Sequence, residues 1–181
     1  GVSGKSSVRF TTNRINPADE LGANRDDAIS LGNTTARFKD MWLSGGVYLG
    51  GTGAANYLDD YEEGTFTATL VPQASGTISL NSTKDAMAYT KIGRFVTVQG
   101  EITISSVSSP TGDHVKLQGL PFTGADPTER AGRCGGVVIK TSDTVIPSIH
   151  IQLTSEFRIV FDPSTLSGNE NFFISLTYIT S

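Results

Sequence analysis

Apolar and polar residues alternate one by one along several stretches of the second half of this chain. In the run VTVQGEITI at 96–104 they exchange at every step, with a glycine in the middle, and the same period of two recurs at 149–153, 157–161 and 172–178. Side chains of a strand point in turn to the two faces of a sheet, so this period predicts strands that cover a core on one side only. Shorter candidate strands lie at 65–71, 77–80, 86–92, 115–118 and 136–141.

About nine candidate strands with turn residues between them predict a β-sandwich, jelly-roll-like, for residues 59–181. No stretch keeps apolar residues at helical spacing over three turns, and the 20 glycines suit many short strands joined by tight turns. We therefore expect an all-β chain.

Residues 1–58 hold only short apolar groups, separated by Gly, Asn, Asp and Pro. None can close a core against its own neighbours, whereas even a small stable domain buries roughly 60% of its unfolded surface. Phe10, Phe38, Trp42 and Tyr48 are nevertheless unusual in a disordered leader. A flexible leader is one interpretation; we favour an intertwined β-rich stalk and linker that folds by winding around identical copies.

Charge and cysteine content narrow the range of partners. The formal charge is −4 and the 14 basic residues are scattered, which argues against a nucleic-acid backbone as partner. No apolar run reaches the length of a membrane span, so no membrane insertion is expected. Cys134 is the single cysteine, which excludes a disulfide framework within one chain and a cysteine-based zinc site. Such a chain fits manufacture in a reducing cytoplasm.

The densest group of carboxylates is DDYEE at 59–63. It could hold calcium or form the acid pair of a glycosidase, but its spacing is not that of an EF-hand loop. A linker also lacks the apolar pocket that would raise one pKa for acid catalysis. We expect these acids to be solvated, or to pair with Lys or Arg from a neighbouring copy.

Neither histidine lies in a motif for a nucleophile or a metal, so we expect no catalytic residue, no metal site and no cofactor. His150 falls on the polar side of its strand, which favours solvent exposure or a contact between subunits. Four aromatic residues could stack on sugar rings: Trp42, Tyr89, Phe122 and Tyr178. We expect packed positions for Trp42, Phe122 and Tyr178.

Several stretches resemble phage tail fibres and tailspikes. ISLGNTTARFKDMWLSGG at 29–46 resembles a unit of those fibres and would form a strand, one helical turn at 37–42 and a second strand. GGTGAANYLDDYEEGTF at 50–66 resembles the linker into their C-terminal domain, although Phe-Thr-Ala at 66–68 replaces the usual Trp-Thr-Pro. YTKIGRFV at 89–96 and LPF at 120–122 are similar to the core of that domain.

This resemblance implies a short trimeric stalk followed by the head, in the tail fibre of a virion made in the cytoplasm of a bacterial host. The implied partners are two further copies, other tail proteins, and a bacterial surface glycan or outer-membrane protein that the fibre tip binds. A tailspike depolymerase, of which this chain would be stalk and cap, is the alternative. The chain lacks the repeated rungs of a long β-helix, so we expect no enzyme. A purely structural trimerisation cap is a third interpretation.

A parity argument places the receptor site. If each strand reverses direction, the turn at 71–76 lies away from the stalk, the loops at 81–85 and 106–113 face it, and the Gly93 turn and the loop at 120–134 again lie away from it. The loop at 120–134, with help from the turn near 154–155, would therefore bind receptor. Its mixed charges suit a glycan, unless they pair with each other or across the trimer. The candidate receptor-binding residues are Asp126, Glu129, Arg130 and Arg133, joined by Gln73.

Overall fold

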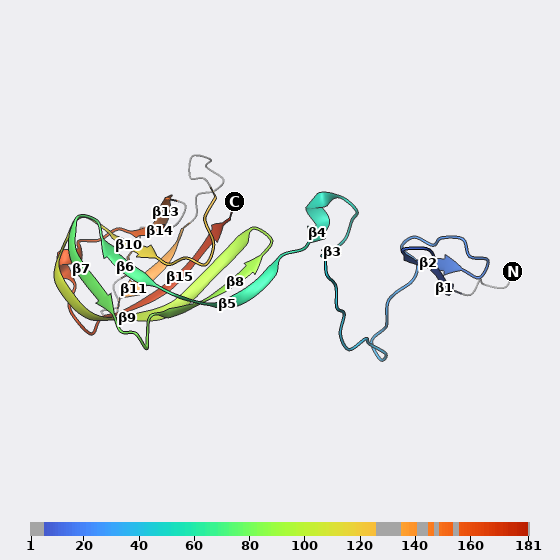
Figure 1. The fold of residues 1–181 in the computed structure, drawn as a ribbon, viewed down its shortest axis with the longest axis horizontal. Helices are drawn as coiled ribbons and strands as arrows, with labels where there is room; N and C mark the ends of the chain where they lie inside the picture. Colours follow the sequence, from blue (N-terminus) through green and yellow to red (C-terminus); the bar gives the residue numbers. More distant parts are fainter. Residues whose placement is uncertain (1–5, 126–134, 141–144, 147–148, 154–155, 181) are drawn as a thin grey trace. The chain divides into compact units, whose positions relative to one another are not determined.

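The computed structural model describes residues 6–125, 135–140, 145–146, 149–153 and 156–180, with only the backbone for 145–146 and 149–153 (Figure 1). The chain divides into two compact units, Gly1–Ser44 and Gly45–Ser181, so the predicted boundary after Leu58 lies inside the second unit.

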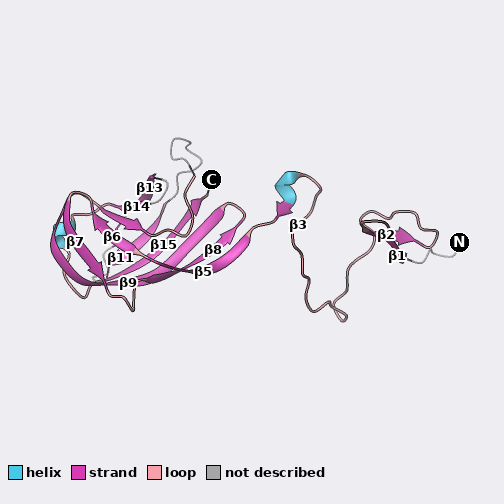
Figure 2. Ribbon diagram, in the orientation of Figure 1, coloured by secondary structure: helices cyan, strands magenta, loops and turns pink. Residues whose placement is uncertain are grey.

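Strands make up most of the second unit, whereas the described residues of the first unit hold one hairpin and are otherwise turns and irregular chain (Figure 2). Within the described ranges the helical elements are two 3-10 turns, Ala54–Asn56 and Pro163–Thr165, and the all-β prediction is confirmed for them. Neither turn is long or apolar enough to be a membrane span.

The first unit contains one hairpin, β1 (Ser6–Phe10) with β2 (Ile15–Asp19). Polar contacts hold it: Arg9 donates from Nη1 to the Gly22 carbonyl at 2.8 Å, and Asp19 Oδ1 accepts from the backbone N–H groups of Leu21 and Ala23, each at 2.9 Å. Ala18 is the one buried residue between positions 6 and 58. The described residues of this unit therefore form no apolar core of their own.

The predicted helical turn at 37–42 is wrong. Asn33 forms a tight turn instead, in which its Oδ1 accepts from the backbone N–H groups of Thr35 at 2.9 Å and Ala36 at 2.7 Å. Residues 37–42 then run without helix or strand. A single helical turn is marginal in water unless an apolar face is buried, and Phe38 and Trp42 are both exposed in this chain.

The second unit opens with a short hairpin, β3 (Val47–Tyr48) with β4 (Tyr57–Leu58), and continues into two antiparallel sheets. The larger sheet has seven strands: β5 (Tyr61–Thr67), β7 (Ser75–Leu80), β8 (Ala86–Ile92), β9 (Phe95–Thr111), β11 (Gly136–Lys140), β12 (Val145–Ile146) and β15 (Asn171–Ile179). The smaller sheet has four: β6 (Thr69–Pro72), β10 (Val115–Gln118), β13 (Ile149–Leu153) and β14 (Glu156–Ile159). We call residues 61–180 the head.

Side chains from both sheets meet in one core. Every second residue of β15, and in β9 Val96, Val98, Ile102 and Ile104, points inward and is buried. Phe157 and Ile159 of β14 face them from the smaller sheet. The one-sided burial predicted from the alternation at 96–104 and 172–178 is thus confirmed. The rings of Phe157 and Tyr178 pack edge to face across this core, with their centroids 5.4 Å apart.

The assumption that each strand reverses direction is wrong between β7 and β8, and the single strand predicted at 65–71 is divided between the two sheets. β5 and β6 follow one another with only Ala68 between them, and they pair in different sheets. β7 and β8 both pair antiparallel with β9, β8 along its first part and β7 along its last, so they run the same way. Residues 81–85 between them do not form a reversing loop. They carry the chain onward beside β9, where Asn81 donates from its N–H to the Thr103 carbonyl at 2.8 Å.

The missed step reverses the predicted ends of the turns that follow it, whereas the 71–76 turn lies away from the linker as predicted. The Gly93 turn lies beside Asp60, where the linker enters; we call this the linker end. β9 then continues through most of the predicted 106–113 loop to Thr111, where Ala74 donates from its N–H to the Thr111 carbonyl at 3.1 Å. The turns at 73–74 and 112–113 therefore share the opposite end, which we call the far end, and β9 connects the two ends in Figure 1.

Candidate functional site

The motif residues that are separate in sequence meet at the linker end of the head. Asp60 precedes β5 and forms an ion pair with Lys91, near the end of β8. Lys91 is only 7% exposed, and Gly93 donates from its N–H to the Asp60 carbonyl at 2.6 Å. A nearly buried ammonium group needs a partner, and this linker carboxylate supplies it.

A second linker carboxylate, Glu62, is bound two residues further along the chain. Tyr89 donates from its hydroxyl to Glu62 Oε1 at 2.5 Å, and this hydrogen bond, helped by partial burial, raises the pKa of Tyr89 above its ordinary 10.0. Gly64 lies opposite Tyr89 in the sheet, and a Cβ at that position would come within 2.9 Å of the tyrosine oxygen. The linker thus needs a glycine here to admit the ring.

Phe122 completes the cluster at this end. Its ring packs edge to face on Tyr89 with centroids 5.4 Å apart, and the Lys91 ammonium lies 5.2 Å from its centroid. Tyr178 accepts from the Phe122 N–H at 3.3 Å and donates to its carbonyl at 3.1 Å. We call Asp60, Glu62, Tyr89, Lys91 and Phe122 the linker clasp.

The clasp shows what two of the acids of the DDYEE motif at 59–63 bind. Asp60 and Glu62 are engaged by Lys91 and Tyr89 of their own chain, so the expected pairing with a neighbouring copy is wrong for Asp60. Both carboxylates hold β5 in the sheet, and neither lies in an apolar pocket that would prepare it for acid catalysis: Asp60 is half-exposed and Glu62 is exposed.

Gln73 is the one predicted receptor residue within the described ranges. It lies exposed in the far-end turn, where its Oε1 accepts from the Asp113 N–H at 2.9 Å and its own N–H donates to the His114 carbonyl at 3.1 Å. Gly112 has φ +126°, and a Cβ there would come within 2.7 Å of Gln73 Cβ. Gln73 therefore joins the two far-end turns.

Sequence reasoning missed a charged cluster beside Gln73. His114 donates from Nδ1 to Asp113 Oδ1 at 2.5 Å, and Arg158 Nη2 donates to the same oxygen at 3.2 Å. The histidine bond, followed by the arginine charge, holds the pKa of Asp113 below its ordinary 3.8. His114 is buried, although no local motif marked it; the signal was its place directly before the alternating strand β10.

The other predicted receptor residues, Asp126, Glu129, Arg130 and Arg133, lie outside the described residues, as does the 154–155 turn. The described start of their loop lies at the linker end, because Ala125 donates from its N–H to the Ile179 carbonyl at 2.7 Å and Gly124 bridges Thr180. Gln73 lies at the far end. The prediction that this loop and the 71–76 turn begin at the same end is therefore wrong.

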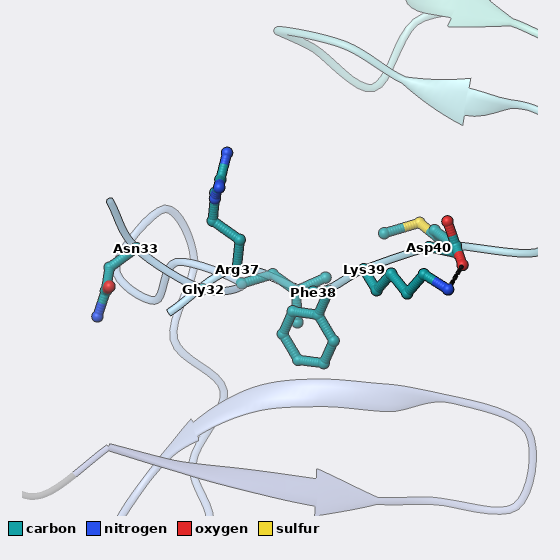
Figure 3. A pocket seen from close by; sticks show the side chains of 8 residues that line it. Gly32, Asn33, Arg37, Phe38, Lys39 and Asp40 are labelled. Carbon is teal, nitrogen blue, oxygen red and sulfur yellow. Dashed lines mark ion pairs between the residues drawn. The ribbon is translucent and has the colours of Figure 1, made fainter. Parts of the chain in front are cut away.

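A hollow of about 510 Å³ lies along residues 31–41 of the first unit. Figure 3 shows Arg37 and Phe38 pointing to opposite sides of the chain, and Lys39 turned toward Asp40, with 3.9 Å between Nζ and Oδ2. Phe38 is 66% exposed and Trp42, one residue past the hollow, is 93% exposed. The packed position expected for Trp42 is thus not found within one chain, whereas Tyr178 is buried in the core.

Across the described ranges, no three His, Cys, Asp or Glu side chains come together as they would around a metal ion. Comparison with known proteins found no matching family model, no matching curated protein and no matching solved structure.

Proposed function

We propose that this chain forms the tip of a phage tail fibre. In this proposal three copies wind together along the stalk and linker, and each copy ends in a jelly-roll-like head that binds a bacterial surface glycan or outer-membrane protein. Other tail proteins of the virion would hold the fibre, and the chain itself would carry out no catalysis.

One observation carries the proposal: most of the large apolar side chains of residues 6–58 are exposed in the described structure. The exposed set includes Phe10, Leu21, Leu31, Phe38, Met41, Trp42 and Leu49. Burial of each such side chain stabilises a structure by about 1.5–3 kcal/mol, so a segment with this many exposed is suited to fold around others. Identical copies supply the same apolar side chains in the same order, which is what a shared core along an axis requires.

The linker clasp gives further support. The three stretches that resemble tail fibres, at 50–66, 89–96 and 120–122, contribute every member of the clasp. A fibre tip must transmit force from stalk to head, and an ion pair, a hydrogen bond and a packed ring at the linker end attach the first head strand firmly. The two-sheet head then serves as a rigid scaffold for loops that touch a receptor.

The test uses the full chain, labelled with a fluorophore and mixed with a panel of bacterial strains and an array of purified bacterial surface polysaccharides. We expect saturable binding to some strains and not to others, without release of reducing ends. Binding to no strain and no polysaccharide would contradict receptor recognition and favour a structural cap. Release of reducing ends would instead favour a depolymerase.

A further inference from the structure

A row of apolar side chains crosses four strands of the larger sheet at the linker end. The strand register places Tyr61 beside Ile92, Ile92 beside Phe95, and Phe95 beside Ile179. Tyr61, Ile92 and Phe95 are 60%, 51% and 59% exposed. Their neighbours in sequence point the other way, so the row lies on the outer face of the sheet. We call these four residues the apolar row.

The face around the row carries few charges. The next row inward is Glu63, Thr90, Thr97 and Thr177, again in register across β5, β8, β9 and β15. Two more rows follow, and over all four the charged side chains are Glu63 and Glu101, with no lysine or arginine. The outer face of the smaller sheet, by contrast, presents Lys116 and Arg158.

Two charged residues lie beside the row: Glu63 in the adjoining row, and Arg94 in the turn between Ile92 and Phe95, whose Nε donates to the Thr180 carbonyl at 3.0 Å. Apolar and aromatic side chains with so few charges around them are typical of the centre of a protein–protein interface. A sugar would stack on an aromatic ring only if polar side chains around that ring bound its hydroxyl groups. Within the row, the direct neighbours of Phe95 are Ile92 and Ile179, which offer no hydrogen bonds. The chemistry of the row therefore favours a protein surface over a glycan.

We propose that the apolar row is where the heads of neighbouring copies of this chain pack against one another. The inference rests on the proposed assembly and goes further by naming the head surface that takes part. Tyr61 begins the first head strand, directly after the segment whose apolar side chains are exposed. Copies joined along that segment start their heads together, so the row is the first head surface that meets its equivalent, at high effective concentration.

Cross-linking of the full chain tests this placement. In a Cys134→Ser background, Ile92→Cys puts a thiol in the row, and Val71→Cys puts one at an exposed aliphatic position, 37% exposed, on the outer face of the smaller sheet. Both variants are treated with a short bismaleimide at micromolar concentration. We expect covalent multimers from Ile92→Cys on a denaturing gel, at least tenfold more than from Val71→Cys.

Light scattering on the same samples tests the three-chain assembly separately from the apolar row as its interface. A three-chain mass without the Ile92→Cys cross-link, or with equal cross-linking of both variants, overturns the row as an interface and leaves the assembly standing. A one-chain mass overturns both. A further variant carries Phe95→Glu. If this variant no longer binds bacterial cells but keeps the three-chain mass and the Ile92→Cys cross-link, the row is a receptor surface instead.

Discussion

The first unit and the head use the same kinds of side chain in opposite ways. In the head, Phe157, Phe172 and Tyr178 are fully buried between two sheets, while in the first unit Phe10, Phe38 and Trp42 lie in solvent. The head has enough strands to close a core, and the first unit has one hairpin. Residue type thus decides less than the number of strands that can fold back on one another.

The same contrast separates the forces that hold each region. Arg9 and Asp19 fix the first hairpin by hydrogen bonds to backbone groups, and such bonds each add only about 1 kcal/mol net. The head gains from a continuous apolar cluster. The head thus closes a core within one chain, whereas in the proposed assembly residues 6–58 would obtain their stability from other copies.

The largest expected effect comes from the head core. Phe157→Ala should lower the free energy of unfolding by about 3–5 kcal/mol, because it leaves a cavity against Tyr178. Chemical denaturation followed by circular dichroism measures this, and the loss should not depend on protein concentration. A cost below about 1 kcal/mol would mean that the two sheets do not share a core as described.

The matched test in the first unit is Trp42→Ala. Within one chain this exposed residue would contribute little, within about 0.5 kcal/mol. If copies bury it, the substitution should raise the concentration at which half the chains are assembled by at least about tenfold. Sedimentation at a series of concentrations measures the change, with the exposed Lys39→Ala as control. Equal behaviour of the two variants would contradict a packed role for Trp42.

A smaller effect is expected at the linker clasp. Asp60→Asn leaves the Lys91 ammonium without its carboxylate and should cost about 1–3 kcal/mol in thermal or chemical unfolding. The double variant Asp60→Asn with Lys91→Met removes both charges and should recover part of that loss. If the double variant is as unstable as the two single losses added together, the pair does not act as a unit.

The smallest effect should appear at the far end, as a dependence on pH. Asp113 has a folded pKa below 3.8, so its contribution to stability is full above about pH 3.8 and is lost as the pH falls through the lowered folded value. Asp113→Asn should therefore be less stable than the parent near neutral pH, and the difference should shrink in strong acid. A difference that stays constant down to acid pH would show that the carboxylate charge plays no part.

Much of the head could be predicted from local pattern. The predicted strand at 86–92 coincides with β8, and inward residues of β9 and β15 follow the alternation because a half-buried strand shows that period directly. The direction of β8 could not be predicted. Asn, Ser, Asp and Thr at 81–85 are the residues of a reversing hairpin turn, and only the length of β9 allows two strands to pair with it in succession.

The end of β9 shows another limit. Its last residues, SSVSSPT at 105–111, contain two serine pairs and a proline, which are typical of a loop. Pairing with β7 keeps them extended, and Ser109 takes a positive φ of 45° within the strand. Such an irregular strand exists because a partner strand lies alongside it. Nothing in the local sequence indicates that partner.

Sequence pattern alone did not predict the residues of the linker clasp. Only the resemblance to tail fibres marked the stretches that contain them. Asp60 and Lys91 are far apart in sequence, and nothing local marks them as an ion pair; the register of β5 on β8 brings them together. The far-end pairing of Gln73 with Asp113 likewise depends on two turns that pattern analysis placed at opposite ends. Contacts between turns follow from topology, and a single missed step moves every later turn to the other end of the head.

The most direct test of the account is the mass of the full chain in solution. Multi-angle light scattering at micromolar concentration should give three times the 19.2 kDa mass of one chain, because the proposed assembly would bury the exposed apolar side chains of residues 6–58 against other copies. In obligate oligomers folding and association are inseparable, so unfolding should also shift to higher temperature as the concentration rises. A mass of 19.2 kDa with the stalk segment folded would contradict the account.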